Sequence, residues 1–268
     1  MDEVLEEIEF LALSENRIDV LNAVCDGPRT RRELEEITGA SQPTLGRVLR
    51  DFDDRNWISS AGDGYEATAT GRLVADGITD LYEILETELK LRDIVAWLPT
   101  EAMTFDLRRL RDATIVVPSQ TRPSAPVQRV TELVSRADRT RVVSHAFNER
   151  MIEVVREHAV EEDGTFGGVL SASAIDAVAE DAALRRPLRD LVEAENAEIR
   201  IYDGEIPFAV SIADDVVNML VRDEAGMLQA SLETDDGTVR DWALDLHEEY
   251  WDDARPLEAS DLEGDGSC

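Results

Sequence analysis

Lysine is almost absent from this 268-residue sequence, in which Lys90 stands beside 26 arginines. The chain therefore lacks the lysine that follows the glycines of a phosphate-binding P-loop, and Lys90 is the sole candidate for Schiff-base chemistry. Cysteine is equally scarce, because Cys25 and Cys268 are too few for a disulfide framework or a zinc site. We expect no metal or other cofactor. The three histidines are too widely spaced for a local metal motif: His145, His158 and His247.

Long apolar stretches are missing too, since no run of about 18 uncharged apolar residues occurs. The first ten residues, MDEVLEEIEF, are acidic where a secretory signal peptide would be basic. We therefore expect no membrane span, no export and a cytoplasmic protein. A hydrophobic fraction of 43% is nevertheless that of a globular protein, and the length suits one large domain or two ordinary ones.

Positive charge is scarce, because 27 basic residues face 59 acidic ones and the formal net charge is −32. Such a charge normally argues against nucleic acid as a partner, since affinity for DNA comes largely from Lys and Arg that neutralise phosphates. However, high acidity with arginine in place of lysine is similar to the proteins of salt-in halophilic archaea, where strong salt screens self-repulsion. We therefore interpret the acidity as a mark of a halophilic habitat, which leaves DNA binding open.

Three short helical patterns lie in the first 57 residues. The first covers 14–27 and ends at a Gly-Pro pair. Thr30 and Glu33 are then spaced as a capping box, in which hydroxyl and carboxylate satisfy the first amides of a second helix. Gly39 ends that helix, and Ser41 is expected to cap a third. Two helices joined so tightly, with glycine in the turn, form a helix-turn-helix.

The third helix has an apolar face and a polar face. Its expected inward residues follow the helical repeat: Leu45, Val48, Leu49 and Phe52. Arg47 and Arg50 project from the opposite face, and residues 27–50 hold five arginines against three glutamates, a local charge of +2. Short polar and arginine side chains suit base edges and phosphates in the major groove. The predicted DNA-binding residues are Arg29, Arg31, Arg32, Ser41, Gln42, Thr44, Arg47 and Arg50.

A β-hairpin is predicted after the third helix, with strands at 57–60 and 65–68. The stretch 30–77, with its caps, its Trp-Ile pair and the T-x-T-G-R sequence at 68–72, resembles the archaeal winged-helix regulators related to the ArsR and MarR groups. The resemblance implies a winged helix-turn-helix that binds double-stranded DNA. Asp63 stands at the wing tip without a nearby Lys or Arg, which argues against minor-groove insertion by the wing. A module that docks a protein without binding DNA is the alternative.

Residues 78–98 predict a linking helix. Its apolar stripe consists of Ile78, Leu81, Tyr82, Leu85, Leu89, Ile94, Val95 and Leu98. Such a stripe needs a partner, and the resemblance to winged-helix regulators implies dimerisation through the helix after the wing. We expect a homodimer. Packing of the stripe on its own domain is the alternative.

From Ala113 onward, strand and helix patterns alternate and then give way to four strands and a final helix. This order predicts an α/β domain, a mixed sheet with helices on its faces, in a chain that is α+β overall. The expected strands are 113–119, 140–147, 165–172, 197–204, 207–215, 216–223 and 227–234, and the expected helices are 126–137, 148–164, 175–180, 187–195 and 238–254.

The order of elements and the phrase IYDGEIPF at 201–208 resemble the middle domain of the methanogenesis regulatory protein family and, more distantly, the TrmB regulators. Those domains look like half of a phospholipase D fold, so the resemblance implies an effector domain. Phospholipase D chemistry needs a histidine with a lysine two residues on, whereas Ala146 and Phe147 follow His145. We expect no enzyme activity and no catalytic residue.

An effector pocket in such a sheet is expected outside the carboxyl ends of the strands. Arg122, in the loop after the first strand, is suited to an anionic group. That these are ordinary loop residues, in a domain that only oligomerises, is the alternative. The candidate effector-binding residues are Ser119, Gln120, Arg122, Ser144, His145, Tyr202 and Asp203.

Four segments are therefore predicted: a winged helix-turn-helix at 1–77, a helical linker and dimerisation segment at 78–111, an α/β effector domain at 112–255 and a tail at 256–268. The tail is small, polar and acidic, so we expect it to be disordered. The whole indicates a sequence-specific DNA-binding transcriptional regulator of a halophilic archaeon, a homodimer whose second domain senses a small-molecule effector or oligomerises.

Overall fold

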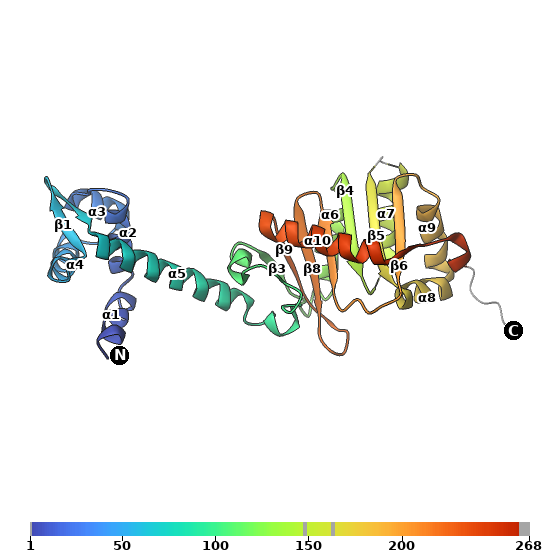
Figure 1. The fold of residues 1–268 in the computed structure, drawn as a ribbon, viewed down its shortest axis with the longest axis horizontal. Helices are drawn as coiled ribbons and strands as arrows, with labels where there is room; N and C mark the ends of the chain where they lie inside the picture. The colour runs from blue at the N-terminus through green and yellow to red at the C-terminus, as the bar shows by residue number, and fades with distance from the viewer. Residues whose placement is uncertain (1, 147–148, 162–163, 263–268) are drawn as a thin grey trace. The chain divides into compact units, whose positions relative to one another are not determined.

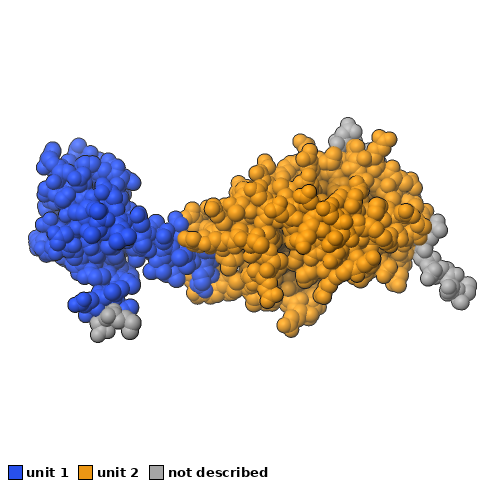
Figure 2. Space-filling view, in the orientation of Figure 1, with its two compact units in different colours: residues 1–88 blue, residues 89–268 orange. Residues whose placement is uncertain are grey.

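The computed structural model describes residues 2–146, 149–161 and 164–262, which form two compact units. Figure 2 colours unit 1, residues 1–88, and unit 2, residues 89–268, and the boundary falls inside one helix. Within the described residues, no helix is both long enough and apolar enough to cross a membrane.

Unit 1 is a small helical domain with a two-stranded hairpin. Its elements are α1 (Asp2–Ala12), α2 (Glu15–Cys25), α3 (Arg31–Thr38), α4 (Gln42–Asp54), β1 (Ile58–Ala61), β2 (Gly64–Ala67) and α5 (Ala69–Leu91). The four apolar residues predicted on the third helix are all buried in the core. The helix-turn-helix and the hairpin are confirmed, whereas α1 was not predicted from the sequence.

The turn between α3 and α4 owes its shape to local hydrogen bonds and one glycine. The Glu33 carboxylate accepts from the Thr30 amide at 2.8 Å, and the Glu33 amide donates to the Thr30 hydroxyl at 3.3 Å, so the capping box is confirmed. Gly39 ends α3 with φ of 67°, a left-handed conformation that favours glycine. Ser41 occupies the N-cap position of α4, but its hydroxyl pairs with the Thr44 hydroxyl at 3.0 Å. Ser41 is thus the N-cap residue that the sequence predicted, but its side chain makes no capping hydrogen bond.

The hairpin is joined by a two-residue turn, and Gly62 in it has φ of 60°. A third segment pairs with it, because the backbones of Arg29 and Tyr65 exchange two hydrogen bonds of 2.8 Å. Gly71 lies so close to Trp57 that a Cβ atom there would be 1.9 Å from the Trp57 carbonyl oxygen. The hairpin is thereby fixed to the segments on either side of it.

The helix after the wing begins earlier and ends earlier than predicted. α5 starts at Ala69, and a break after Leu91 leads to the 3-10 turn η1 (Val95–Trp97). The residues of the predicted apolar stripe therefore have different surroundings. Ile78 is buried in unit 1, and Ile94 and Leu98 are buried in unit 2. The other members stay exposed by 38% to 60%: Leu81, Tyr82, Leu85, Leu89 and Val95.

Unit 2 is built on one mixed sheet of eight strands among the described residues. The strands are β3 (Thr114–Val116), β4 (Arg139–Ser144), β5 (Thr165–Ser171), β6 (Ala197–Tyr202), β7 (Ala209–Ala213), β8 (Val216–Arg222), β9 (Leu228–Thr234) and β10 (Arg255–Pro256). They lie in the order β10-β6-β5-β4-β7-β8-β9-β3, in which β4, β5 and β6 are parallel and every other pair is antiparallel. The predicted mixed α/β architecture is confirmed.

Helices cover both faces of the sheet (Figure 1). Four pack on one face, namely α6 (Ala125–Val134), α7 (Glu149–Arg156), α8 (Ala172–Glu180) and α9 (Ala182–Val192), while α10 (Gly237–Asp253) crosses the other. A π-helical turn at Glu157–Glu161 follows α7. Two apolar cores result, and residues 91–113, including the 3-10 turn η2 (Leu107–Leu110), join the core under α10. Both faces of the sheet are therefore shielded by helices.

The chain after α10 is ordered where it is described. Arg255 and Pro256 pair with β6, and the Leu257 amide donates to the Ile199 carbonyl at 2.8 Å. Leu257 is 5% exposed, and Leu262, at the end of the 3-10 turn η4 (Ala259–Leu262), is fully buried. The prediction of a disordered tail is wrong for residues 256–262, because two leucines anchor this polar segment, and 263–268 lie outside the described residues.

Candidate nucleic-acid interface and ligand pocket

The outer face of α4 collects the polar residues that the sequence nominated. Arg47 and Arg50 lie one turn apart and are both exposed, as are Ser41 and Gln42 at the start of the helix, while Thr44 is half-buried. The apolar face of α4 is buried, so these side chains are held at fixed positions on the surface of unit 1.

Four arginines of unit 1 form two contrasting pairs. Arg55 pairs with Glu7 at 2.6 Å, and Arg17 lies 3.9 Å from Asp51, while the guanidinium groups of both stack on the Phe10 ring. Arg47 and Arg50 form no ion pair within the described residues. The first pair therefore has a structural role, while the second keeps its charge available for a partner.

Two glutamates of α3 are engaged in internal hydrogen bonds. The bonds from the Thr30 backbone and hydroxyl lower the pKa of Glu33, which stays ionised inside the capping box. Glu35 accepts a hydrogen bond of 2.6 Å from the Gln42 amide. The Gln42 side chain is thus turned toward α3 in the free protein and would have to exchange this bond to reach a base.

The remaining predicted DNA-binding residues surround the start of α3. Arg31 and Arg32 are exposed, and the Arg31 guanidinium lies 5.9 Å from the centre of the Tyr65 ring in the hairpin. Arg29 is half-buried, and its Nε has no hydrogen-bond partner within the described residues. α3, α4 and the hairpin therefore place the predicted basic residues on one small unit, next to an exposed wing tip that carries Asp63.

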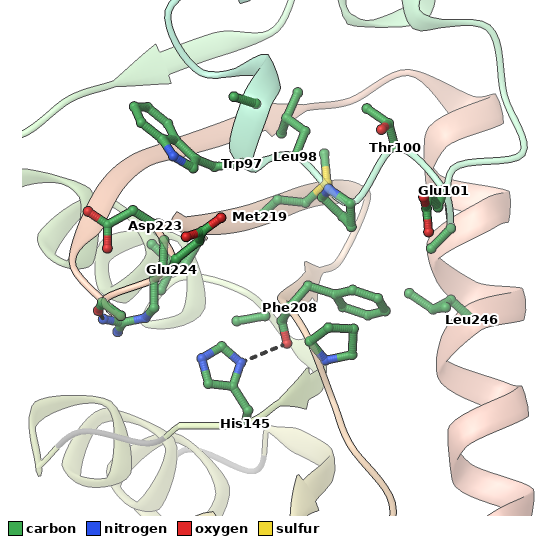
Figure 3. A pocket seen from close by; sticks show the side chains of 18 of the residues that line it. Trp97, Leu98, Thr100, Glu101, His145, Phe208, Met219, Asp223, Glu224 and Leu246 are labelled. Atoms are coloured by element: carbon green, nitrogen blue, oxygen red, sulfur yellow. Dashed lines mark hydrogen bonds between the residues drawn. The ribbon is translucent and has the colours of Figure 1, made fainter.

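A pocket of about 980 Å³ lies in unit 2, at the edge of the sheet where β4 and β8 end and β7 begins. Phe208, Met219 and Leu246 contribute apolar surface, and residues 96–102, which follow α5, line it with Trp97 and Glu101 (Figure 3). The lining is completed by polar residues of the β8–β9 turn and of α10: Arg222, Asp223, Glu224, Gly226, Glu249 and Tyr250.

Among the predicted effector residues, His145 lines this pocket, and its Nδ1 lies 3.2 Å from the Phe208 carbonyl oxygen (Figure 3). Tyr202 does not line the pocket, but its ring meets the ring of Tyr250, which does, edge-on with centroids 4.9 Å apart. Ser144 is buried at the end of β4, with its hydroxyl bonded to the Ala146 carbonyl.

The other predicted effector residues are exposed and do not line the pocket. Ser119, Gln120 and Arg122 belong to the loop between β3 and α6, where the Ser119 hydroxyl accepts from the Arg122 amide. Asp203 follows β6. The structure therefore separates the predicted anion-binding loop from the pocket that contains His145.

Sequence reasoning missed most residues that line the pocket. Trp97, Phe208 and Tyr250 come from three distant segments, and their apolar character made them candidates for the core alone. One signal was present, since the expected pocket edge lay at the carboxyl ends of strands, where β4 and β8 end. Within the described residues, no group of His, Cys, Asp or Glu is arranged to hold a metal ion.

Two family models match this chain in sequence. Residues 5–90 match the HVO_A0261 N-terminal domain, and residues 123–253 match the middle domain of the methanogenesis regulatory protein FilR1. No curated protein matches it significantly.

Similar solved structures share little sequence with the chain. TrmBL2, described as an archaeal chromatin protein, is 15% identical, with 95% of this chain and 98% of that chain covered and a TM-score of 0.44. NucT from Helicobacter pylori is 12% identical, and Nuc from Salmonella typhimurium, a phospholipase D family member, is 14% identical. Each covers 55% of this chain and 99% of its own, with a TM-score of 0.43. In sequence, the chain thus combines a segment that matches the HVO_A0261 N-terminal domain with one that matches the FilR1 middle domain.

Proposed function

We propose that this protein is a sequence-specific DNA-binding transcriptional regulator. The observation that carries the proposal is that Arg47 and Arg50 are exposed on the outer face of α4 and form no ion pair within the described residues, in a chain with more than twice as many acidic as basic residues. An unpaired arginine is suited to a phosphate or a guanine edge. The match of residues 123–253 to a domain of a regulatory protein supports the regulatory part of the proposal.

The regulator acts as a homodimer in this proposal, through the exposed stripe of α5. Leu81, Leu85 and Leu89 are spaced by four residues, and Tyr82 lies beside them, so the exposed apolar side chains follow one side of the helix. Val4 and Leu5 of α1 are also exposed, by 63% and 58%. A second copy that covers these side chains would place two recognition helices on one DNA site. The acidic composition supports a halophilic source, and we propose that such a regulator acts in the cytoplasm of a halophilic archaeon.

We assign no enzymatic activity to unit 2. His145, the histidine at the pocket, is followed in sequence by Ala146 and Phe147, so the lysine of phospholipase D chemistry is missing there. An effector role, in which a ligand of unit 2 changes the DNA occupancy of unit 1, agrees better with these residues.

The test is DNA binding by the full-length protein at fixed salt. Genome-wide occupancy mapping would identify the bound promoters, and footprinting on one of them should show an imperfect palindrome. Substitution of both Arg47→Ala and Arg50→Ala should weaken binding by about 30-fold or more, since each base or phosphate contact contributes about 1 kcal/mol or more. The matched control is Arg136→Ala, an exposed arginine of unit 2. Unchanged affinity of the double variant would refute the orientation, and absence of any bound promoter would favour a protein-docking module.

A further inference from the structure

The pocket of unit 2 has an apolar interior and a polar rim. Met219 is 1% exposed and Phe208 is 7% exposed, and both contribute to the lining. Figure 3 shows Trp97 with Asp223 and Glu224 toward one end and Glu101 with Leu246 toward the other. A cavity of this size with apolar walls and a few polar groups is typical of small-molecule sites.

Acidic residues outnumber basic residues in the lining of the pocket. Among the described residues that line the pocket, Arg222 is the one basic residue besides His145, and its Nη1 donates to the Gly226 carbonyl at 2.9 Å. The carboxylate of Asp223 is also engaged, since it accepts hydrogen bonds from the backbone of its own turn and from Gln229. Three further carboxylates line the pocket without an ion pair among the described residues: Glu101, Glu224 and Glu249.

Aromatic rings accompany these carboxylates. The rings of Phe208 and Tyr250 meet edge-on, with centroids 6.1 Å apart, and Trp97 is half-buried in the lining. The faces of aromatic rings attract cations, and Trp attracts them most strongly. Burial raises the pKa of Tyr250, so its phenol remains neutral at pH 7.

His145 lies at the same pocket. The Phe208 carbonyl oxygen can only accept, so a hydrogen bond across the 3.2 Å contact is donated by Nδ1 of His145. This bond holds the imidazole ring in the pocket wall.

A second concavity of unit 2 has a smaller surplus of acidic residues. It measures about 860 Å³ on the α10 side of β4, β5 and β6, and two arginines and three glutamates line it, whereas one arginine and four carboxylates line the first pocket. Arg139, Arg141 and His247 stand there with Glu195, Glu198 and Glu248. The surplus of carboxylates in the first pocket is thus more than a reflection of the acidic chain as a whole.

We propose that the pocket lined by Trp97, His145 and Glu224 binds a small organic cation, an ammonium compound with an aromatic or apolar body. The apolar walls and rings receive the body, and Glu224, at the end of the pocket that also holds Trp97, attracts the charge. This assigns a ligand class to the effector role and rests on the proposed function only for the consequence in transcription.

The experiment is calorimetric titration of the full-length protein, without DNA, with three compounds of similar shape. These are 2-phenylethylammonium, 2-phenylethanol and 3-phenylpropionate, measured at equal ionic strength. The ammonium compound should bind about tenfold more tightly than the alcohol, and the carboxylate should bind most weakly. Because DNA is absent, a failure here leaves the DNA-binding proposal standing, and a failure of DNA binding leaves this result standing.

Two variants locate the site. Glu224→Gln should weaken binding of the ammonium compound about threefold to tenfold and leave binding of the alcohol unchanged, and Trp97→Leu should weaken binding of both. Glu248→Gln is the matched control, because Glu248 adjoins Glu249 in α10 but lines the second concavity. Circular dichroism verifies the fold of each variant. Equal affinity for the three compounds, binding of none, or the same loss in Glu248→Gln as in Glu224→Gln would overturn the proposal.

Discussion

Two arginines of unit 2 and two arginines on α4 of unit 1 have opposite surroundings. In unit 2, Arg129 donates to both oxygens of Glu233 at 2.6 and 2.7 Å, and Arg255 donates to both oxygens of Asp261 at 2.9 Å. On the outer face of α4 in unit 1, Arg47 and Arg50 have no such partner within the described residues. In a chain with 59 acidic residues, the absence of an ion pair is more informative than the presence of an arginine.

The largest effect on stability is expected for the ion pair between Arg129 and Glu233, whose carboxylate is buried. Glu233 is 8% exposed, and Arg129→Met would leave its carboxylate buried without a partner. We expect a loss of about 2 to 3 kcal/mol in the free energy of unfolding, less than for a fully buried pair because Arg129 is partly exposed. Denaturant titration measures it, and adding Glu233→Met should recover most of the loss. No recovery in the double variant would contradict this account.

Substitution of the two α4 arginines should affect DNA binding but hardly affect stability. Arg47→Ala with Arg50→Ala should change the free energy of unfolding by less than about 0.5 kcal/mol, since exposed side chains without partners contribute little. The slope of log affinity for DNA against log salt should become shallower, by roughly one for each phosphate that an arginine no longer neutralises. Fluorescence anisotropy over a salt series measures the slope. A large loss of stability would show that these arginines are structural after all.

The fold was largely readable from the sequence, because its helices and strands follow regular apolar repeats with glycine and capping residues at their ends. Thr30 and Glu33 are a case in which the sequence specifies the local geometry. α1 was missed although Val4, Ile8 and Leu11 follow a helical repeat, because the acidic first ten residues were considered only as evidence against a signal peptide. The pocket was missed because its lining comes from segments that only the tertiary fold brings together.

Two helix N-caps of unit 1 differ in one respect. The Thr30 side chain makes a capping hydrogen bond and the Ser41 side chain does not, so the two can be compared to measure what that bond contributes to stability. Thr30→Ala removes a hydroxyl that bonds the Glu33 amide and should destabilise unit 1 by about 1 kcal/mol. Ser41→Ala removes a hydroxyl that bonds only Thr44 and should have a markedly smaller effect. Thermal unfolding of the two variants under equal conditions measures the two losses of stability. Equal losses would show that the Ser41 side chain caps α4 in solution.

The smallest effect concerns a surface pair and depends on pH. The hydrogen bonds from Arg255 lower the pKa of Asp261 in the folded protein. A carboxyl group with a lowered pKa stabilises the fold above its unfolded pKa, near 3.9, and this contribution is lost as the pH falls through the folded pKa. Asp261→Asn should therefore cost about 0.5 kcal/mol at pH 7, and the difference from the parent should vanish in more acidic solution. A difference that persists at pH 2 would point to packing instead.

The short strands at the two margins of the sheet have a consequence for association. β10 has two residues, one of them a proline without an amide hydrogen, and β3 has three. Exposed margins of long strands are the usual sites at which sheets of neighbouring molecules join and aggregate. Residues 255–262 therefore leave little of one margin of the sheet free to pair with a strand of another molecule.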